Sequence, residues 1–383
     1  MNDFLERNGH NCVIAYSKGP SFNTEHEYKI GSRLDTKIHG LLSRLSGMQG
    51  YFSCGATKKL LRFMDNYKPD VVVLRNLHGN FINLPLLLKY LANKDIATVV
   101  VLHDCWFYTG KCCHYTVQGC FKWQASCGNC PQLKKHNKSW FFDRTKKMLA
   151  DKKKLFDAIP RLAVVGVSDW LTNEAKKAPV FENAKIITRI YNWIDTEKFS
   201  SRNADELREK LGLSDKKIIL SVASDWSLEK GLDTIIELAN NLKDDERIIL
   251  VGNLPSNVNL CEKILHIPST HSMDELAQLY SLADVFLQPS LEETFGKVTA
   301  EALSCGTPIV CFNYTTTPEL VEHNCGTIVD SLSPNALLEA TRSVLQQEKQ
   351  HFTFNCRKNA VERFSKEGRL NDYILLFDKL TNL

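Results

Sequence analysis

Short runs of β-branched and aliphatic residues alternate with helix-like segments along the whole chain. Each run holds consecutive apolar residues instead of an apolar/polar alternation, which is typical of parallel strands covered by helices on both faces. The runs predicted to be strands are 11–17, 70–76, 96–104, 162–168, 185–192, 216–224, 247–253, 263–269, 283–290, 308–312 and 326–330. A polar, charge-rich stretch at 195–217 separates two series of such runs. The pattern predicts an α/β protein with two doubly wound, Rossmann-like domains.

The domain boundary is expected near residue 195. We predict an N-terminal domain over residues 1–195 and a C-terminal domain over residues 196–366, with a last helix at about 367–383 packing back on the first domain. A single eight-stranded barrel is the alternative, but the strands are too many and too unevenly spaced for it. Residues 1–9 resemble the end of a helix, whereas a doubly wound domain opens with a strand. We therefore expect a truncated start that lacks the first strand.

Composition narrows the class of protein. The 383 residues are enough for two separate cores, and a net charge of +4 with 43% hydrophobic residues is ordinary for a soluble protein. No apolar run approaches the roughly 20 residues of a membrane span, and the first residues hold no signal-peptide core. Thirteen cysteines are an odd number. Reduced thiols in a cytoplasmic protein are therefore favoured over a disulfide framework.

The first informative strand-to-helix junction follows the run at 216–224. A helix with one apolar face is predicted from residue 232, and Lys230 and Gly231 stand where it begins. An ammonium group beside the amides and the positive end of a helix can bind a phosphate. A solvent-exposed lysine at a helix start would give the same pattern.

The second junction carries two glutamates around a predicted helix start. After the strand at 283–290, Glu293 is expected in an exposed loop, and Glu301 is expected inside the following helix. Were all the residues helical, they would lie roughly 12 Å apart, at about 1.5 Å per residue. That is the scale of the distance between the two sugars of a nucleotide diphosphate-sugar. A surface glutamate and a glutamate favoured by the helix dipole are the alternative.

The residues between these glutamates suit an anion. Backbone amides near Thr294, Phe295 and Gly296 would face a diphosphate, and Gly296 allows the backbone to approach closely. Ionised carboxylates accept hydrogen bonds from sugar hydroxyls. Phosphate and sugar recognition are thus predicted at one junction.

The stretch PSLEETFGKVTAEALSCGTPIV, with EKG some sixty residues earlier, resembles the retaining glycosyltransferases of family 4 and their E-x7-E motif. HDCW, CGNCPQL, YNWIDTEKF and FSKEGRLNDYILLFDKL extend the likeness over most of the chain. The resemblance implies the GT-B fold, in which two domains face each other across a cleft. It also implies a nucleotide-sugar donor (UDP-, GDP- or dTDP-linked) in the second domain, an acceptor in the first and transfer without a required metal cofactor.

By this resemblance, Glu293 would hold the transferred sugar, Glu301 the ribose and Lys230 the diphosphate. The chain departs from the family in two places. Asp225 stands where an arginine usually precedes the lysine, so one phosphate contact is missing. The stretch TTTPE replaces a Gly-Gly turn.

His103 and Asp104 stand at the end of the strand run at 96–104. Family 4 enzymes often carry a histidine at this strand end, near the donor sugar. An imidazole there would hydrogen-bond the sugar or stabilise the departing negative charge, and both residues would lie on the acceptor side. Plain capping of the strand end is the alternative. Retaining transfer on one face of the sugar needs no protein nucleophile, so none is predicted. His103, Lys230 and Glu293 make up the predicted catalytic set.

A cysteine-rich stretch follows, with Cys112, Cys120, Cys127 and Cys130 as candidate ligands of a structural zinc ion. A C-x2-C pair with two further cysteines nearby permits a tetrahedral site of four thiolates. Only one C-x2-C pair is present, and Cys113 and His114 compete with Cys112 for the first position. Free thiols and a disulfide are the alternatives.

The region around these cysteines is basic. Residues 105–165 hold ten lysines and two arginines against three aspartates, and Trp140, Phe141 and Phe142 add bulky aromatic groups. Such a surface is expected to bind an anionic membrane, which suits a lipid-linked acceptor; a solvated helix face is the alternative.

The leading hypothesis is a glycosyltransferase that moves a hexosyl or related sugar, with retention, to a saccharide or lipid-linked acceptor. The resemblance places it in bacterial cell-surface polysaccharide biosynthesis, in the cytoplasm at the inner face of the membrane. A sugar-nucleotide epimerase of similar fold is one alternative. A zinc-containing nucleic-acid-binding protein is another, but it leaves the glutamate pair unexplained and lacks a known binding fold, so no nucleic-acid partner is expected.

Overall fold

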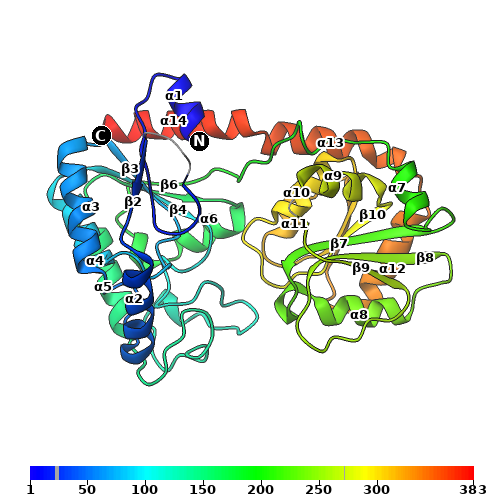
Figure 1. Ribbon diagram of the computed structural model, residues 1–383, viewed down its shortest axis with the longest axis horizontal. Helices are drawn as coiled ribbons and strands as arrows, with labels where there is room; N and C mark the ends of the chain where they lie inside the picture. Colours follow the sequence, from blue (N-terminus) through cyan, green and yellow to red (C-terminus); the bar gives the residue numbers. More distant parts are fainter. Residues whose placement is uncertain (22–25, 271) are drawn as a thin grey trace. The chain divides into compact units, whose positions relative to one another are not determined.

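The computed structural model describes residues 1–21, 26–270 and 272–383. The chain divides into two compact units (Figure 1). Unit 1 comprises Met1–Ile190 and Leu370–Leu383, and unit 2 comprises Tyr191–Arg369. None of the described helices is long and apolar enough to cross a membrane.

Unit 1 is built on a parallel sheet of four strands in the order β3-β4-β5-β6, while β1 and β2 pair separately. Its strands are β1 (Ile14–Tyr16), β2 (Glu27–Lys29), β3 (Val71–Leu74), β4 (Ala97–Leu102), β5 (Leu162–Gly166) and β6 (Ile186–Arg189). Its helices are α1 (Asn2–Arg7), α2 (Arg33–Ser46), α3 (Cys54–Tyr67), α4 (Leu84–Asn93), η1 (Lys122–Gln124), α5 (Thr145–Asp157), α6 (Asp169–Lys176) and η2 (Pro179–Phe181). Every residue of β4 and β5 is buried, as their continuous apolar runs predict.

Unit 2 holds a parallel sheet of six strands in the order β12-β11-β10-β7-β8-β9. Its strands are β7 (Lys217–Asp225), β8 (Glu246–Asn253), β9 (Ile264–Ile267), β10 (Val285–Gln288), β11 (Ile309–Phe312) and β12 (Gly326–Val329). Its helices are α7 (Asp205–Lys210), η3 (Leu228–Lys230), α8 (Leu232–Asn240), α9 (Met273–Leu282), α10 (Lys297–Ser304), α11 (Thr317–Leu320), α12 (Pro334–Leu345) and α13 (Gln350–Phe364). The helix α14 (Lys366–Thr381) leads from unit 2 into unit 1.

Numbered along unit 2, the strand order is 3-2-1-4-5-6, which is the order of the dinucleotide-binding Rossmann fold. The first and fourth strands, β7 and β10, are neighbours, and the chain runs outward in opposite directions from them. Loops that leave such a pair diverge and open a crevice at the carboxyl ends of the strands, where ligands bind.

The predicted elements are present. Each of the eleven runs predicted to be strands overlaps one, whereas β2 was not predicted. At the second junction the order strand, loop, helix, strand is confirmed as β10, the loop at 289–296, α10 and β11. Gly306 follows α10 with a φ of +79°, in the left-handed region that suits a residue just after a helix.

Candidate functional site

A cavity of about 370 Å³ lies in unit 2 at the point where β7 and β10 diverge. Its walls come from the last residues of β7 and from the junctions that follow both strands. The lining residues are Asn192, Val222, Ala223, Ser224, Asp225, Lys230, Gln288, Ser290, Glu293, Thr294, Phe295, Gly296, Lys297 and Val298. The volume is in the range of small-ligand sites, and the place is the one where doubly wound sheets bind ligands.

The two predicted junctions meet in this cavity through an ion pair. The Nζ atom of Lys230 lies 2.6 Å from Oε2 of Glu293. The side chains are 34% and 16% exposed, so the pair is open to a ligand at one side. The expectation of an exposed Glu293 was wrong, because the lysine holds the carboxylate against the cavity wall. The loop position of Glu293 was right.

A glycine allows the two junctions to come so close. Gly231 has a φ of +79°, and a Cβ atom added there would lie 2.5 Å from the carbonyl oxygen of Pro289. Any side chain would therefore push apart the segments that carry Lys230 and Glu293. The sequence Lys-Gly thus supplies both the cation and the space for it.

The start of α10 forms another part of the cavity wall. Gly296 precedes the helix with a φ of +83°, and Gly296, Lys297 and Val298 line the cavity. Amides in the first turn of a helix have no acceptor within the helix, and the helix dipole adds partial positive charge. Phe295 is buried, with ring centroids 6.0 Å from Tyr191 and 5.5 Å from Phe364. That packing fixes the loop from which the helix begins.

Glu301 lies one turn further along α10 and is not among the residues that line the cavity. Its Oε2 atom accepts a hydrogen bond of 3.0 Å from the hydroxyl of Tyr280. Burial raises the pKa of Glu301 to about 7, against the lowering effects of that hydroxyl and of Lys297. The structure therefore brings Lys230, Glu293 and the helix start together but directs Glu301 to Tyr280. Its ribose role stays a prediction.

Lys297 is a lining residue that the sequence analysis missed. The signal was present, since a lysine directly after the glycine at a helix start places a cation beside free amides. Asp225 also lines the cavity and accepts a hydrogen bond of 3.2 Å from Asn253. Lys297 is thus a second cation in a site where the sequence shows Asp225 in place of an arginine.

In unit 1, His103 and Asp104 directly follow β4, as predicted, and both are half-buried. Asp104 accepts a hydrogen bond of 2.8 Å from the Trp106 amide, and its other oxygen lies 3.6 Å from Nδ1 of His78. Among the described residues, His78, Asp104 and Cys113 form a group whose potential metal-binding atoms all lie within 4.8 Å of one another. The acceptor-side role of His103 and Asp104 stays a prediction.

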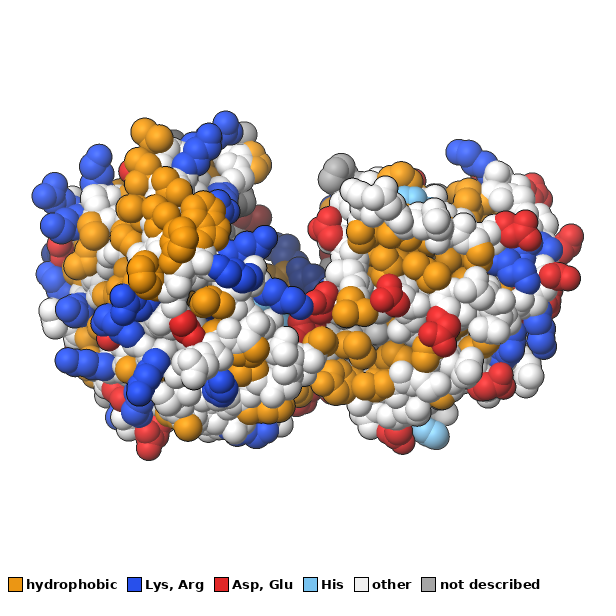
Figure 2. Space-filling view, turned by 90° about the horizontal axis from the view of Figure 1, so that it is seen from below, with side chains coloured by type: hydrophobic (Ala, Val, Ile, Leu, Met, Phe, Trp, Pro, Cys, Tyr) orange, Lys and Arg blue, Asp and Glu red, His pale blue; other side chains and the backbone are white. Residues whose placement is uncertain are grey.

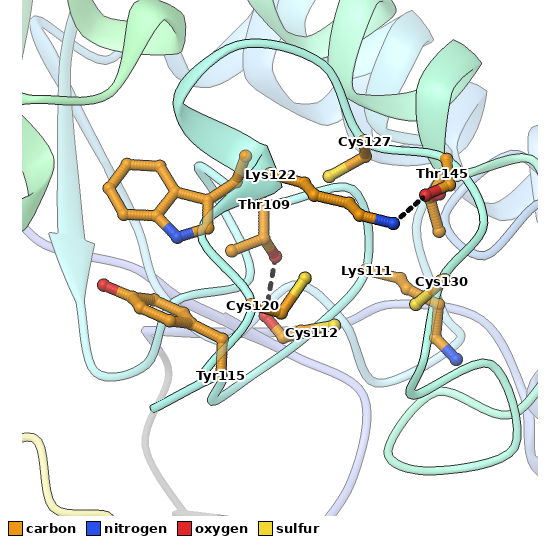
Figure 3. Close-up of a pocket in the computed structure, with 11 residues that line it drawn as sticks. Thr109, Lys111, Cys112, Tyr115, Cys120, Lys122, Cys127, Cys130 and Thr145 are labelled. Carbon is orange, nitrogen blue, oxygen red and sulfur yellow. Dashed lines mark hydrogen bonds between the residues drawn. The ribbon is translucent and has the colours of Figure 1, made fainter. Parts of the chain in front are cut away.

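The four cysteines predicted as zinc ligands line one cavity of unit 1, together with Lys111, Tyr115 and Trp123 (Figure 3). Cys113, a competing candidate, is not among the lining residues. The tertiary structure thus distinguishes two adjacent cysteines that the sequence left equivalent.

Solved glycosyltransferases share this fold. A glycosyltransferase from Rickettsia africae matches with a TM-score of 0.68 and 16% identity, over 99% of this chain and 92% of that one. Anabaena Alr3699/HepE in complex with UDP matches with a TM-score of 0.60 and 17% identity, over 86% of this chain and 82% of that one. The predicted fold class, two Rossmann-like domains of the GT-B type, is confirmed.

Sequence comparison identifies the domain in unit 2. Residues 203–369, which are less than half of the chain, match the family described as glycosyl transferases group 1. An N-acetyl-alpha-D-glucosaminyl L-malate synthase of Bacillus anthracis is 25% identical over 56% of this chain. An alpha-galactosylglucosyldiacylglycerol synthase of Streptococcus pneumoniae is 29% identical over 50% of this chain. The matches span little more than half of these relatives, 58% and 55% of their lengths.

Proposed function

We propose that this protein is a retaining glycosyltransferase that uses a nucleotide-diphosphate sugar as donor and a saccharide or a lipid-linked saccharide as acceptor. The observation that carries the proposal is the cavity between β7 and β10, where Lys230, Glu293 and the start of α10 meet. The cations and helix amides suit a diphosphate, and the carboxylate suits sugar hydroxyls. The Anabaena neighbour was solved with UDP and with UDP-glucose, which supports a donor of this class.

Each lining group takes a role that its position supports. Lys230 and the amides near Thr294, Phe295 and Gly296 bind the diphosphate, and Glu293 binds the hydroxyls of the transferred sugar. Gly231 does not line the cavity, and its amide donates to the Leu228 carbonyl oxygen at 2.9 Å, so its role is to let the two junctions approach. Without donor, Glu293 neutralises Lys230 at 2.6 Å. A bound diphosphate replaces that carboxylate as the counter-ion and leaves Glu293 to accept hydrogen bonds from the sugar. Glu301 is proposed for the ribose.

The transfer needs no metal and no protein nucleophile in this proposal. The acceptor oxygen forms a bond to the anomeric carbon as the bond from that carbon to the diphosphate oxygen breaks on the same face. The acceptor proton moves to the leaving diphosphate, whose negative charge Lys230 and the helix start stabilise. On the acceptor side, His103 is proposed to hydrogen-bond the sugar, with Asp104 beside it.

A binding screen tests the donor class. Saturation-transfer NMR with UDP-, GDP- and dTDP-sugars should show one nucleotide series bound, and Glu293→Gln should lower turnover roughly 100- to 1,000-fold with an unchanged melting temperature. Glu237→Gln, an exposed glutamate on α8, is the matched control and should turn over normally. Normal turnover in Glu293→Gln would contradict the assigned role. Isomerised donor formed without acceptor would favour an epimerase.

The acceptor proposal rests on an exposed apolar surface of unit 1. On α2 the buried side chains are His39 and Ser43, whereas its large apolar residues face outward. The exposed set is Leu34, Ile38, Leu41, Leu42 and Leu45, joined by Trp140, Phe141 and Phe142. The two segments meet where the Trp140 amide donates to the Arg44 carbonyl oxygen, at 2.7 Å. Figure 2 shows hydrophobic side chains gathered on unit 1 with Lys and Arg side chains beside them.

We propose that this surface binds anionic lipid at the inner face of the cytoplasmic membrane, during synthesis of a cell-surface polysaccharide. A helix with apolar and basic residues on one exposed side is suited to the membrane interface. The chain should co-sediment with vesicles in proportion to their anionic lipid, and Ile38→Gln with Leu41→Gln should abolish this. Leu375→Gln, an exposed leucine on α14, is the control. Co-sedimentation that ignores anionic lipid content would overturn the proposal.

A further inference from the structure

The thiol-lined cavity of unit 1 lies in a segment with little regular structure. Residues 103–144, all of which the structure describes, hold η1 but no strand or α-helix. Within this segment Cys112, Cys120, Cys127 and Cys130 converge on one cavity (Figure 3). Loops of such length are uncommon in compact domains unless something besides backbone hydrogen bonds orders them.

The side chains that line the cavity are suited to binding a soft metal ion. Thiolates prefer zinc among the common divalent ions, and four of them make a closed tetrahedral site. The cavity has a volume of about 20 Å³, which is room for one ion or water. Cys127 and Cys130 form the C-x2-C pair that is frequent in zinc sites.

Two buried lysines supply a second, independent observation. The ammonium of Lys111, which lines the cavity, donates to the carbonyl oxygens of Gln132, Leu133 and Lys135 at 2.9, 2.8 and 3.1 Å. The ammonium of Lys152 donates to the carbonyl oxygens of Trp106 and Thr109, the latter at 2.9 Å. Neither lysine forms an ion pair with a carboxylate in the part of the chain that the structure describes.

Asp143 and Asp104 lie near enough to attract Lys111 and Lys152, respectively, but neither carboxylate is in ion-pair contact with its lysine. Buried ammonium groups without a counter-charge in contact are strongly disfavoured. A zinc ion with four thiolates carries a net charge of −2, which two lysines offset. Thr109 connects the two features, because its carbonyl oxygen accepts from Lys152 and its hydroxyl donates to the Cys112 carbonyl oxygen at 2.7 Å.

In the structure the four cysteine sulfurs lie farther apart than in a zinc-bound site. Zinc–sulfur bonds of about 2.3 Å put the four sulfurs roughly 3.8 Å apart. Among the described residues, the potential metal-binding atoms of His78, Asp104 and Cys113 all lie within 4.8 Å of one another. The sulfurs of the four cavity cysteines do not meet this limit. That trio mixes hard and soft ligands, and Asp104 is already held by the Trp106 amide. Closure of the cavity site therefore requires the sulfurs to move inward, within a segment that holds turn hydrogen bonds but no strand or α-helix.

We propose that Cys112, Cys120, Cys127 and Cys130 bind one structural zinc ion, with Lys111 and Lys152 as its charge partners. Binding releases the four thiol protons and forms four zinc–sulfur bonds, with no change of oxidation state. The ion then fixes the segment 103–144 against β4 and α5. This role is independent of the proposed transferase activity and of its donor.

Metal analysis of the purified full chain, kept under reducing conditions, tests the proposal. About one equivalent of zinc per chain is expected. Cobalt exchanged into the site should give the intense visible and near-ultraviolet bands of a tetrahedral thiolate complex. Wild-type protein with substoichiometric zinc, with iron in its place, or with cobalt bands that lack sulfur charge transfer would overturn it. These measurements need no variant, so a misfolded mutant cannot mask the outcome.

Variants then assign the ligands. Cys127→Ser and Cys130→Ser should each lower bound zinc at least tenfold, whereas Cys113→Ser, the neighbour outside the cavity, should keep about one equivalent. Equal loss in Cys113→Ser would overturn the ligand set. An intact mass two hydrogens short, with no metal bound, would show a disulfide instead.

Discussion

In unit 2 the polar groups of the cavity stand on short junctions directly after β7 and β10, while in unit 1 the thiols stand on the long segment that follows β4. The unit 2 junctions are fixed at both ends by strands and helices. Lys230 and Glu293, 63 positions apart in the chain, therefore meet at 2.6 Å. The segment 103–144 holds turn hydrogen bonds but no strand or α-helix, so buried side chains contribute much of its order.

The side chains that hold this segment are large. Trp106, Tyr108, Tyr115 and Trp123 are almost wholly buried, and Lys111 and Lys152 bridge separate carbonyl groups. Side-chain hydrogen bonds or a bound metal can order a segment that lacks the regular backbone hydrogen bonds of a strand or helix. The segment is then ordered only while those side chains or that metal are in place. The cavity of unit 2 should therefore tolerate chemical treatments that disorder the cysteine segment.

Metal removal should give the largest difference between the two regions. A zinc chelator under reducing conditions should speed amide hydrogen exchange roughly 100-fold or more in residues 105–135, because zinc binding and local folding are coupled. The amides of β7 and β10 should keep their protection. Exchange followed by mass spectrometry measures both, and equal acceleration in the two regions would break the comparison.

Loss of the glycine at the first junction should be the next largest effect. Gly231→Ala should lower the free energy of unfolding of unit 2 by roughly 3 kcal/mol or more, because of its positive φ and the contact with Pro289. Gly212→Ala is the matched control, since Gly212 has a φ of +67° with nothing within 4 Å of an added Cβ. It should cost about 1 kcal/mol in urea unfolding. Equal costs would show that close approach is not what selects Gly231.

The buried carboxyl of Glu301 should make stability depend on pH. Its pKa is about 7 in the folded chain against an ordinary value of 4.5, so between these values the folded state holds a proton that the unfolded state has released. Stability should therefore fall as pH rises through this window, by roughly 3 kcal/mol at most. Glu301→Gln should flatten this part of the profile in urea titrations from pH 5 to 8. Glu237→Gln, on the exposed face of α8, should leave it unchanged.

The smallest expected effect belongs to Lys297. Lys297→Ala should weaken donor binding about tenfold, the size of one charge-assisted contact at a partly exposed site. Calorimetry at low and high salt measures it, and the difference from wild type should shrink as salt screens the charge. Lys243→Ala, an exposed lysine elsewhere in unit 2, should change nothing. An unchanged affinity in Lys297→Ala would leave Lys230 as the cation that the site uses.

Much of the fold could be predicted because it depends on local patterns. Continuous apolar runs indicated buried parallel strands, and the Lys-Gly and Phe-Gly pairs marked the helix starts at which Lys230 and Glu293 stand. The misses had non-local causes. Glu293 is half-buried because Lys230 reaches it from another junction. Lys297 was overlooked because its role as a cation of the site depends on the cavity that it lines.

The sequence by itself determined the order of strands and helices and the residue types at two strand ends, since hydrophobic period, glycine and helix starts act over a few neighbouring positions. Only the tertiary structure decided that Glu301 turns to Tyr280, that Cys112 and not Cys113 faces the thiol cavity, and that the leucines of α2 point outward. The direction in which a side chain points depends on which distant element packs against it, and no local pattern carries that information.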